Sequence, residues 1–190
     1  MQELHLTQEW DKVFPKSNKV DHKKVTFTNH FGITLAADQY TPKNYEGKLP
    51  ALAVAGPFGA VKEQSSGLYA QTMAEKGHLT IAFDPSFTGE SGGDVRDVFS
   101  LDINTEDYQA AVDYLSNLSN VDPEKIGIIG ICGWGGISLN AAAMDPRVKA
   151  SAAVTMYDMP RVGAWGYFDQ GTADDRYASK KQIAEQRTKE

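Results

Sequence analysis

The sequence has a single cysteine, only four histidines, and fewer basic than acidic residues, 19 against 25. Its single cysteine, Cys132, cannot form a disulfide within the chain. Neither a cysteine–histidine cluster nor an HExxH motif occurs, so we expect no metal site and no cofactor. The formal net charge is −6, whereas nucleic-acid binding usually needs a basic surface, so we also expect no nucleic-acid partner.

Long apolar segments are also missing. No run of about 18 apolar residues could cross a membrane, and the N-terminal stretch MQELHLTQEWDKVF lacks the apolar core of a secretory signal. The composition, 41% hydrophobic and 23% charged, is ordinary for a globular domain, and 190 residues can enclose one core. We therefore expect a soluble, cytoplasmic protein that has no membrane partner and keeps its cysteine reduced.

What the sequence does contain is an alternation of apolar strands and helices. After a polar lead-in at 1–22 with a short helix, the β-rich segments 25–29 and 33–42 predict an antiparallel hairpin. Further strands are predicted at 49–56, 79–84, 125–131 and 149–156. Helices are predicted at 64–76 and 136–144, and a third helix is predicted to follow Asn104, which is its expected N-cap. This order predicts a mostly parallel sheet with helices on both faces.

The glycine-rich turn GIIGICGWGG, residues 127–136, places Cys132 between a predicted strand and a predicted helix. A nucleophile elbow has the pattern small-x-nucleophile-x-small, because larger neighbours would collide with the sharp turn. Gly130 fits the first small position, whereas Trp134 breaks the rule at the second. Cys132 is the only reactive side chain in the turn, but the spacing is equally compatible with a small buried core residue.

An elbow would also supply part of an oxyanion hole. The N–H group of Gly133, which follows the cysteine, and the dipole of the next helix would face the negative charge that forms on the substrate. A dinucleotide-binding turn is the competing interpretation of a glycine-rich corner. It fails here because Ser138 stands where the third glycine of that fingerprint belongs, and because Trp134 fills the turn.

Four segments resemble one branch of the α/β-hydrolase superfamily, near the dienelactone hydrolases. They are PFGAVKEQSSGLYAQTMAEKG (57–77), AFDPSFTGESGG (82–93), DPEKIGIIGICGWGGISLNAAAMDPRVKA (122–150) and TMYDM (155–159). The branch includes acetyl xylan esterase-like proteins and the fungal polyketide transferases and thiohydrolases, and the resemblance covers about residues 10–190. It implies an α/β-hydrolase fold with Cys132 as the nucleophile, and CGWGG resembles a regular variant of the elbow.

The resemblance also implies a second oxyanion donor just after the third strand, within GPFG at 56–59. Pro57 has no N–H group, so Phe58 is the expected donor. The activity that the resemblance implies is hydrolysis of a small-molecule ester or thioester. An acyltransferase of the same fold, and a non-catalytic homologue that binds a ligand or partner, are the alternatives.

The base that a thiol nucleophile needs is not evident. His5 and His22 belong to the lead-in, His30 to the hairpin turn, and His78 precedes a strand, at the end opposite the elbow. Glu90 is expected to order its loop and Asp158 to cap a turn.

Full-length relatives have eight strands, with the acid after the seventh and the histidine after the eighth. The resemblance therefore implies a C-terminally incomplete core of about six strands at 1–160, followed by the start of a lid, cap or insertion at 161–190. We expect this N-terminal portion to be catalytically deficient. Its sixth strand is expected to be an uncovered sheet edge through which oligomers can form.

Overall fold

The computed structural model describes residues 4–189, and the chain divides into two compact units, Met1–Met156 and Tyr157–Glu190. The first unit contains every strand of the described residues. The second contains α4 (Met159–Trp165), a 3₁₀ turn (Tyr167–Asp169) and α5 (Ala173–Lys189). Between residues 4 and 189, no helix is both long enough and apolar enough to span a membrane.

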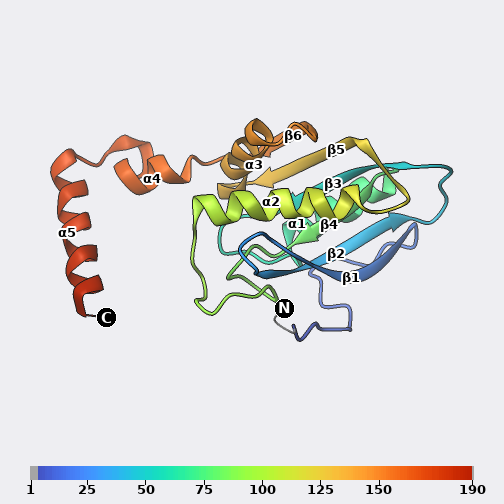
Figure 1. The fold of residues 1–190 in the computed structure, drawn as a ribbon, viewed down its shortest axis with the longest axis horizontal. Helices are drawn as coiled ribbons and strands as arrows, with labels where there is room; N and C mark the ends of the chain where they lie inside the picture. Colours follow the sequence, from blue (N-terminus) through green and yellow to red (C-terminus); the bar gives the residue numbers. More distant parts are fainter. Residues whose placement is uncertain (1–3, 190) are drawn as a thin grey trace. The chain divides into compact units, whose positions relative to one another are not determined.

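The first unit is built on one six-stranded sheet with the order β1-β2-β4-β3-β5-β6 (Figure 1). β2 runs antiparallel to β1 and β4, and the other neighbours are parallel. The strands are β1 (Val20–Thr28), β2 (Thr34–Pro42), β3 (Leu49–Ala55), β4 (Leu79–Phe83), β5 (Val121–Ile131) and β6 (Val148–Val154). The mostly parallel sheet with an N-terminal hairpin is therefore confirmed.

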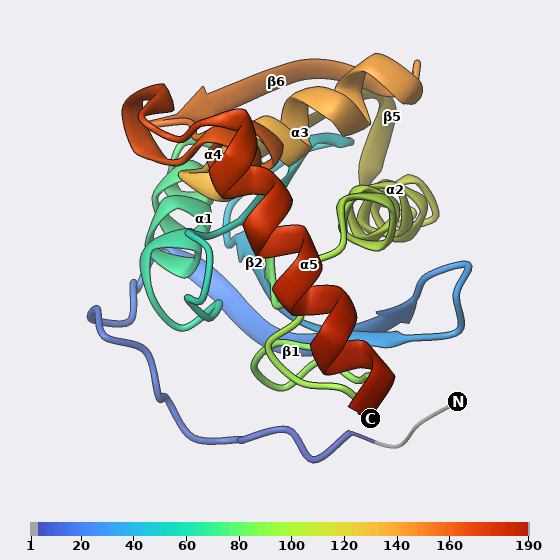
Figure 2. The ribbon, with the colours of Figure 1, turned by 90° about the vertical axis from the view of Figure 1, so that its left-hand side faces the viewer.

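Helices cover both faces of the sheet, as the alternating pattern predicts. α1 (Ser65–Glu75) and α2 (Leu101–Ser116) lie on opposite sides (Figure 2). Apolar residues of α2 and of α3 (Gly133–Met144) share one core cluster with β3, β4 and β5, and residues of α1 belong to the cluster on the other face. Burial on both faces explains why β3 and β4 are continuous apolar runs in the sequence.

Two expectations at the N-terminal ends of elements are wrong. Residues 4–19 contain no helix, and β1 begins at Val20, so His22 lies in a strand rather than in the lead-in. α2 begins four residues earlier than expected, with Ser100 as its N-cap. Asn104 is instead buried inside the helix, where its Oδ1 accepts a hydrogen bond from the Ser100 backbone N–H at 2.9 Å.

The helix after the cysteine also begins earlier than the sequence pattern suggests. α3 starts at Gly133, directly after Cys132, instead of at residue 136. The glycines at 133, 135 and 136 have weak helix propensity, which conceals the first turn of the helix from a propensity argument. In the second unit, the expected cap is confirmed, because the Asp158 carboxylate accepts from the Arg161 N–H at 3.0 Å.

Candidate active site

Cys132 occupies a strained corner between β5 and α3. Its φ is +59° and its ψ is −121°, a conformation that L-residues rarely adopt and that costs about 1–3 kcal/mol. The corner is held in place because the Cys132 backbone N–H donates to the Val154 carbonyl at 2.9 Å, across to the neighbouring strand β6. The residue is half-buried and its thiol is free.

The residues two places away from Cys132 explain how the corner fits. A Cβ atom on Gly130 would overlap the Trp134 backbone carbonyl and approach the Ser138 Oγ to 2.7 Å, so only glycine is accommodated there. Trp134 breaks the pattern without a collision, because its ring is buried against Tyr108 with 5.9 Å between ring centroids. The side chain thus points into the core and leaves the turn free.

The sheet register brings the two expected oxyanion donors to the same edge of the sheet. Ala55 pairs with Gly130 at the end of the parallel β3–β5 ladder. Phe58 lies three residues after Ala55, and Gly133 lies three residues after Gly130. Both therefore lie at the carboxyl ends of these neighbouring strands. Gly133 is the first residue of α3, and the first N–H groups of a helix have no acceptor within the helix.

A small cavity of about 50 Å³ opens beside the elbow. Phe58, Phe99 and Trp134 form much of its apolar lining, and Ser86 and Asn104 add polar groups. The cavity therefore lies between the loop after β3, the loop after β4, and the starts of α2 and α3.

The polar wall of this cavity is organised by a buried carboxylate, Asp107. It accepts hydrogen bonds from the Ser86 N–H at 2.9 Å, the Ser86 hydroxyl at 2.7 Å and the Asn104 amide at 3.0 Å. The Asn29 amide, from the hairpin turn, donates at 2.8 Å. Burial raises the pKa of Asp107, and these donors oppose the shift.

A buried ion pair lies behind the loop after β3. We call residues 56–64 the oxyanion loop and residues 84–100 the β4–α2 loop. Lys62, in the first loop, and Asp84, in the second, both have fully buried side chains, and their charged groups are 2.8 Å apart. Neither residue was singled out from the sequence. The position of Asp84 directly after a buried strand is a signal that could have identified it.

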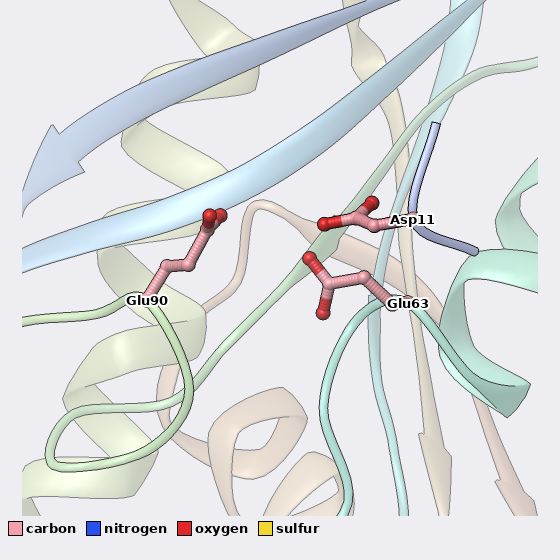
Figure 3. Close-up of side chains that lie close together, drawn as sticks. All are labelled: Asp11, Glu63 and Glu90. Atoms are coloured by element: carbon pink, nitrogen blue, oxygen red, sulfur yellow. The ribbon is translucent and has the colours of Figure 1, made fainter. Parts of the chain in front are cut away.

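Three further carboxylates, Asp11, Glu63 and Glu90, point toward one another next to this pair (Figure 3). Their nearest oxygens lie within 4.8 Å of one another, a spacing that could hold a metal ion. The Lys24 ammonium lies 2.6 Å from Glu90, 3.4 Å from Glu63 and 3.5 Å from Asp11. Lys62 also pairs with Glu63 at 2.6 Å and with Glu90 at 2.7 Å, and Lys12 pairs with Asp11 at 2.7 Å. Lysines thus supply the positive charge, and the cluster is a salt-bridge network between the N-terminal segment, β1 and the two loops.

The histidines do not reach the elbow. His22 bonds to the buried Asp38 carboxylate at 2.7 Å, and His30 is exposed in the hairpin turn. β1 lies four strands from β5, or about 19 Å at 4.8 Å per strand. His78 precedes β4 at the amino end of the parallel strands, and His5 is exposed in the N-terminal segment. The structure therefore places no histidine base beside the cysteine among residues 4–189.

Comparison with known proteins places this site in a family context. The family described as X-Pro dipeptidyl-peptidase (S15 family) matches residues 32–184. The chain is 63% identical over 189 residues to the uncharacterized protein PA2218 of Pseudomonas aeruginosa, covering 99% of this chain and 51% of that protein. The crystal structure of PA2218 superposes with a TM-score of 0.97 over 100% of this chain and 59% of that one.

More distant relatives carry descriptions of activity. The thiohydrolase aneE of Aspergillus aculeatus is 32% identical over 136 residues, which are 70% of this chain and 43% of that protein. Acetyl xylan esterase 1 of Thermoanaerobacterium has a TM-score of 0.69 at 21% identity, over 94% of this chain and 59% of that one, and shows the fold alone.

The chain thus spans about half the length of the curated relatives that it matches. The resemblance to α/β hydrolases and the fold class inferred from it are confirmed. The chain belongs to the α/β-hydrolase superfamily and, within it, to the family described as X-Pro dipeptidyl-peptidase (S15 family).

Proposed function

We propose that Cys132 is the nucleophile of an acyl-transfer site that acts on small-molecule esters or thioesters. The observation that carries the proposal is the positive φ of Cys132 at the corner between β5 and α3. Such strain is retained where it positions a reactive group, and a core cysteine has no need of it. The thiohydrolase relative supports a thioester or ester as the substrate.

The chemistry follows from the groups around the cysteine. The Cys132 sulfur attacks the carbonyl carbon, and the electron pair of the C=O bond moves onto oxygen. The N–H groups of Phe58 and Gly133 donate to this oxyanion. When the oxyanion collapses, the bond to the alkoxide or thiolate leaving group breaks and Cys132 becomes S-acylated. The thiol proton passes to solvent, and the leaving group takes its own proton from solvent.

Release of the acyl group by water is the step in which we propose that this chain is deficient. A positioned acid–base group contributes about 10²–10⁴-fold to such a step, and the described histidines bond elsewhere or lie too far away. We therefore expect an acyl-enzyme that forms and then persists.

The lining of the cavity beside the elbow supports an apolar acyl group. Phe58, Phe99 and Trp134 favour an apolar group there.

Release of p-nitrophenolate from p-nitrophenyl acetate tests the proposal. We expect a burst of about one product per chain, followed by slow turnover, and we expect Cys132→Ala to abolish the burst. Robust turnover that the substitution abolishes would refute the deficiency. A burst that survives the substitution would refute Cys132 as the nucleophile.

Three further expectations stay proposals. Residues 161–190 would form the start of a lid, cap or inter-strand insertion, the protein would act in the cytoplasm, and copies of the chain would associate through β6. The last rests on the sheet order, in which β6 is the final strand and residues 149–153 are exposed.

A further inference from the structure

We propose that Lys62 and Asp84 form a buried positioning pair that holds the oxyanion loop in the geometry required for the Phe58 N–H to donate to the oxyanion that forms when Cys132 attacks the substrate. The inference rests on the proposed acyl-transfer function and extends it to residues that do not contact the substrate.

The two residues make two contacts with each other. The backbone N–H of Lys62 donates to Asp84 Oδ1 at 2.7 Å, and its ammonium donates to Oδ2 at 2.8 Å. The carboxylate therefore fixes both the main chain and the side chain of one loop residue. Since Lys62 is four residues after Phe58, this contact fixes the far end of the segment that carries the proposed oxyanion donor.

Asp84 also anchors the loop that faces the oxyanion loop across the cavity. Its Oδ2 accepts from the Glu90 backbone N–H at 2.9 Å. A Cβ atom on Gly89 would overlap the Asp84 carboxylate, so the β4–α2 loop packs directly on the aspartate. One carboxylate at the end of β4 thus ties together the two loops that line the cavity.

A buried ion pair is a costly way to stabilise a fold, which argues for a role beyond stability. Taking two charges out of water costs several kcal/mol per ion, and well-packed apolar residues often do as well or better. The pair does make sense as a positioning device, because charge-assisted hydrogen bonds are short and directional. Burial lowers the pKa of Lys62, but Asp84, Glu63 and Glu90 outweigh burial and raise it, so the ammonium remains charged.

The test compares two reactions of the same sulfur. Acylation by p-nitrophenyl acetate passes through an oxyanion, whereas alkylation by iodoacetamide does not. We expect Lys62→Met to lower the ratio of acylation rate to alkylation rate at least about tenfold, because small misplacements at a reacting centre cost up to about 10²-fold. Intact-mass spectrometry measures both rates, as acetyl or carbamidomethyl groups added per chain.

Lys12→Met is the matched control. Lys12 and Asp38 form another fully buried lysine–aspartate pair, 3.0 Å apart, which joins the N-terminal segment to β2. Lys12 also pairs with Asp11 at 2.7 Å, and neither of these ion pairs is made with a residue of the oxyanion loop. We expect this variant to lose stability while its rate ratio stays at the wild-type value. An equal loss of ratio in Lys12→Met would mean that any buried ion pair has this effect, and would overturn the proposal.

Two other outcomes are decisive. A folded Lys62→Met chain with an unchanged ratio would overturn the positioning role and leave the proposed function intact. Wild-type chain that is alkylated at Cys132 but never acylated would overturn the proposed function itself. Should Lys62→Met not fold, Asp84→Asn takes its place. It keeps an oxygen for the Lys62 N–H, loses the charge, and turns an amide donor toward the Lys62 ammonium and the Glu90 N–H. We expect the ratio to fall at least about threefold, and an unchanged ratio would again overturn the proposal.

Discussion

At the scale of single residues, the elbow depends on what stands two places before and two places after the cysteine. Gly130 and Cys132 are recognisable in the sequence, because a strained turn imposes a local requirement that a short motif records. Trp134 is not, because the direction of its side chain is decided by distant core residues such as Phe83 and Tyr108. A rule about residue size therefore needs to include where the side chain points.

Trp134→Gly would make the turn match the small-x-nucleophile-x-small pattern, yet we expect it to destabilise the fold. Removing a buried tryptophan side chain costs about 3–5 kcal/mol, and glycine in a helix costs about 1 kcal/mol more. The midpoint of thermal unfolding should fall by about 8–24 °C, at about 2–4 °C per kcal/mol for a chain of this size.

Leu139→Gly is the control for this prediction, since Leu139 is exposed on the same helix. It should cost only the helix propensity, about 1 kcal/mol. Equal unfolding midpoints for the two variants would mean that the Trp134 ring does not stabilise the core.

The charge network also has a residue-scale consequence for pH. Burial raises the pKa of Glu90, but hydrogen bonds from Lys24, Lys62 and the Thr7 N–H outweigh it and lower the pKa to about 2. A carboxylate whose folded pKa lies below its ordinary value adds stability above that value, and this stability is lost as the pH falls through about 4.5 toward 2.

We therefore expect Glu90→Gln to be less stable than the wild type at pH 7, by about 1 kcal/mol, and we expect this difference to shrink below about pH 4.5 and to be nearly gone at pH 2 and below. Chemical unfolding of both proteins across this range measures the difference. Glu46→Gln, at an exposed loop position, should show no comparable pH-dependent gap. A difference in unfolding free energy between Glu90→Gln and the wild type that grows toward low pH would contradict the lowered pKa of Glu90.

At the scale of elements, Asp107 joins three segments that are far apart in the sequence. It connects the hairpin turn through Asn29, the β4–α2 loop through Ser86, and the first turns of α2 through Asn104. The apolar patterns predict these elements well, because burial of one or both faces determines the pattern. They do not predict where the elements are fastened, since a buried carboxylate such as Asp107 has no periodic signature and looks like any acidic residue near a helix N-terminus.

Asp107→Asn tests this fastening point. The amide would turn a donor toward groups that are already donors, at a cost of about 1–3 kcal/mol for each unsatisfied buried group. We expect a lower unfolding midpoint and faster hydrogen exchange in residues 84–94. Asp102→Asn, at an exposed position of the same helix, is the control and should change neither. Unchanged exchange in Asp107→Asn would show that the loop is ordered by other contacts.

At the scale of the whole molecule, the sheet order leaves β6 with one neighbour among the described strands. Exposed strand edges pair with other chains unless charge or shape prevents it. We expect an apparent mass in sedimentation experiments that rises with concentration, and we expect Ala152→Lys, in the exposed middle of β6, to reduce the rise. Asn44→Lys, on an exposed loop, adds the same charge and should have no effect. A concentration-independent monomer would contradict association through this edge.

The most direct measurement maps the acyl group after a brief reaction of the 190-residue chain with p-nitrophenyl acetate. The acylated chain is then digested, and the peptides are identified by mass spectrometry. The account predicts one acetyl group, on the peptide that contains Cys132. Acetyl groups spread over surface lysines, with Cys132 unmodified, would contradict it.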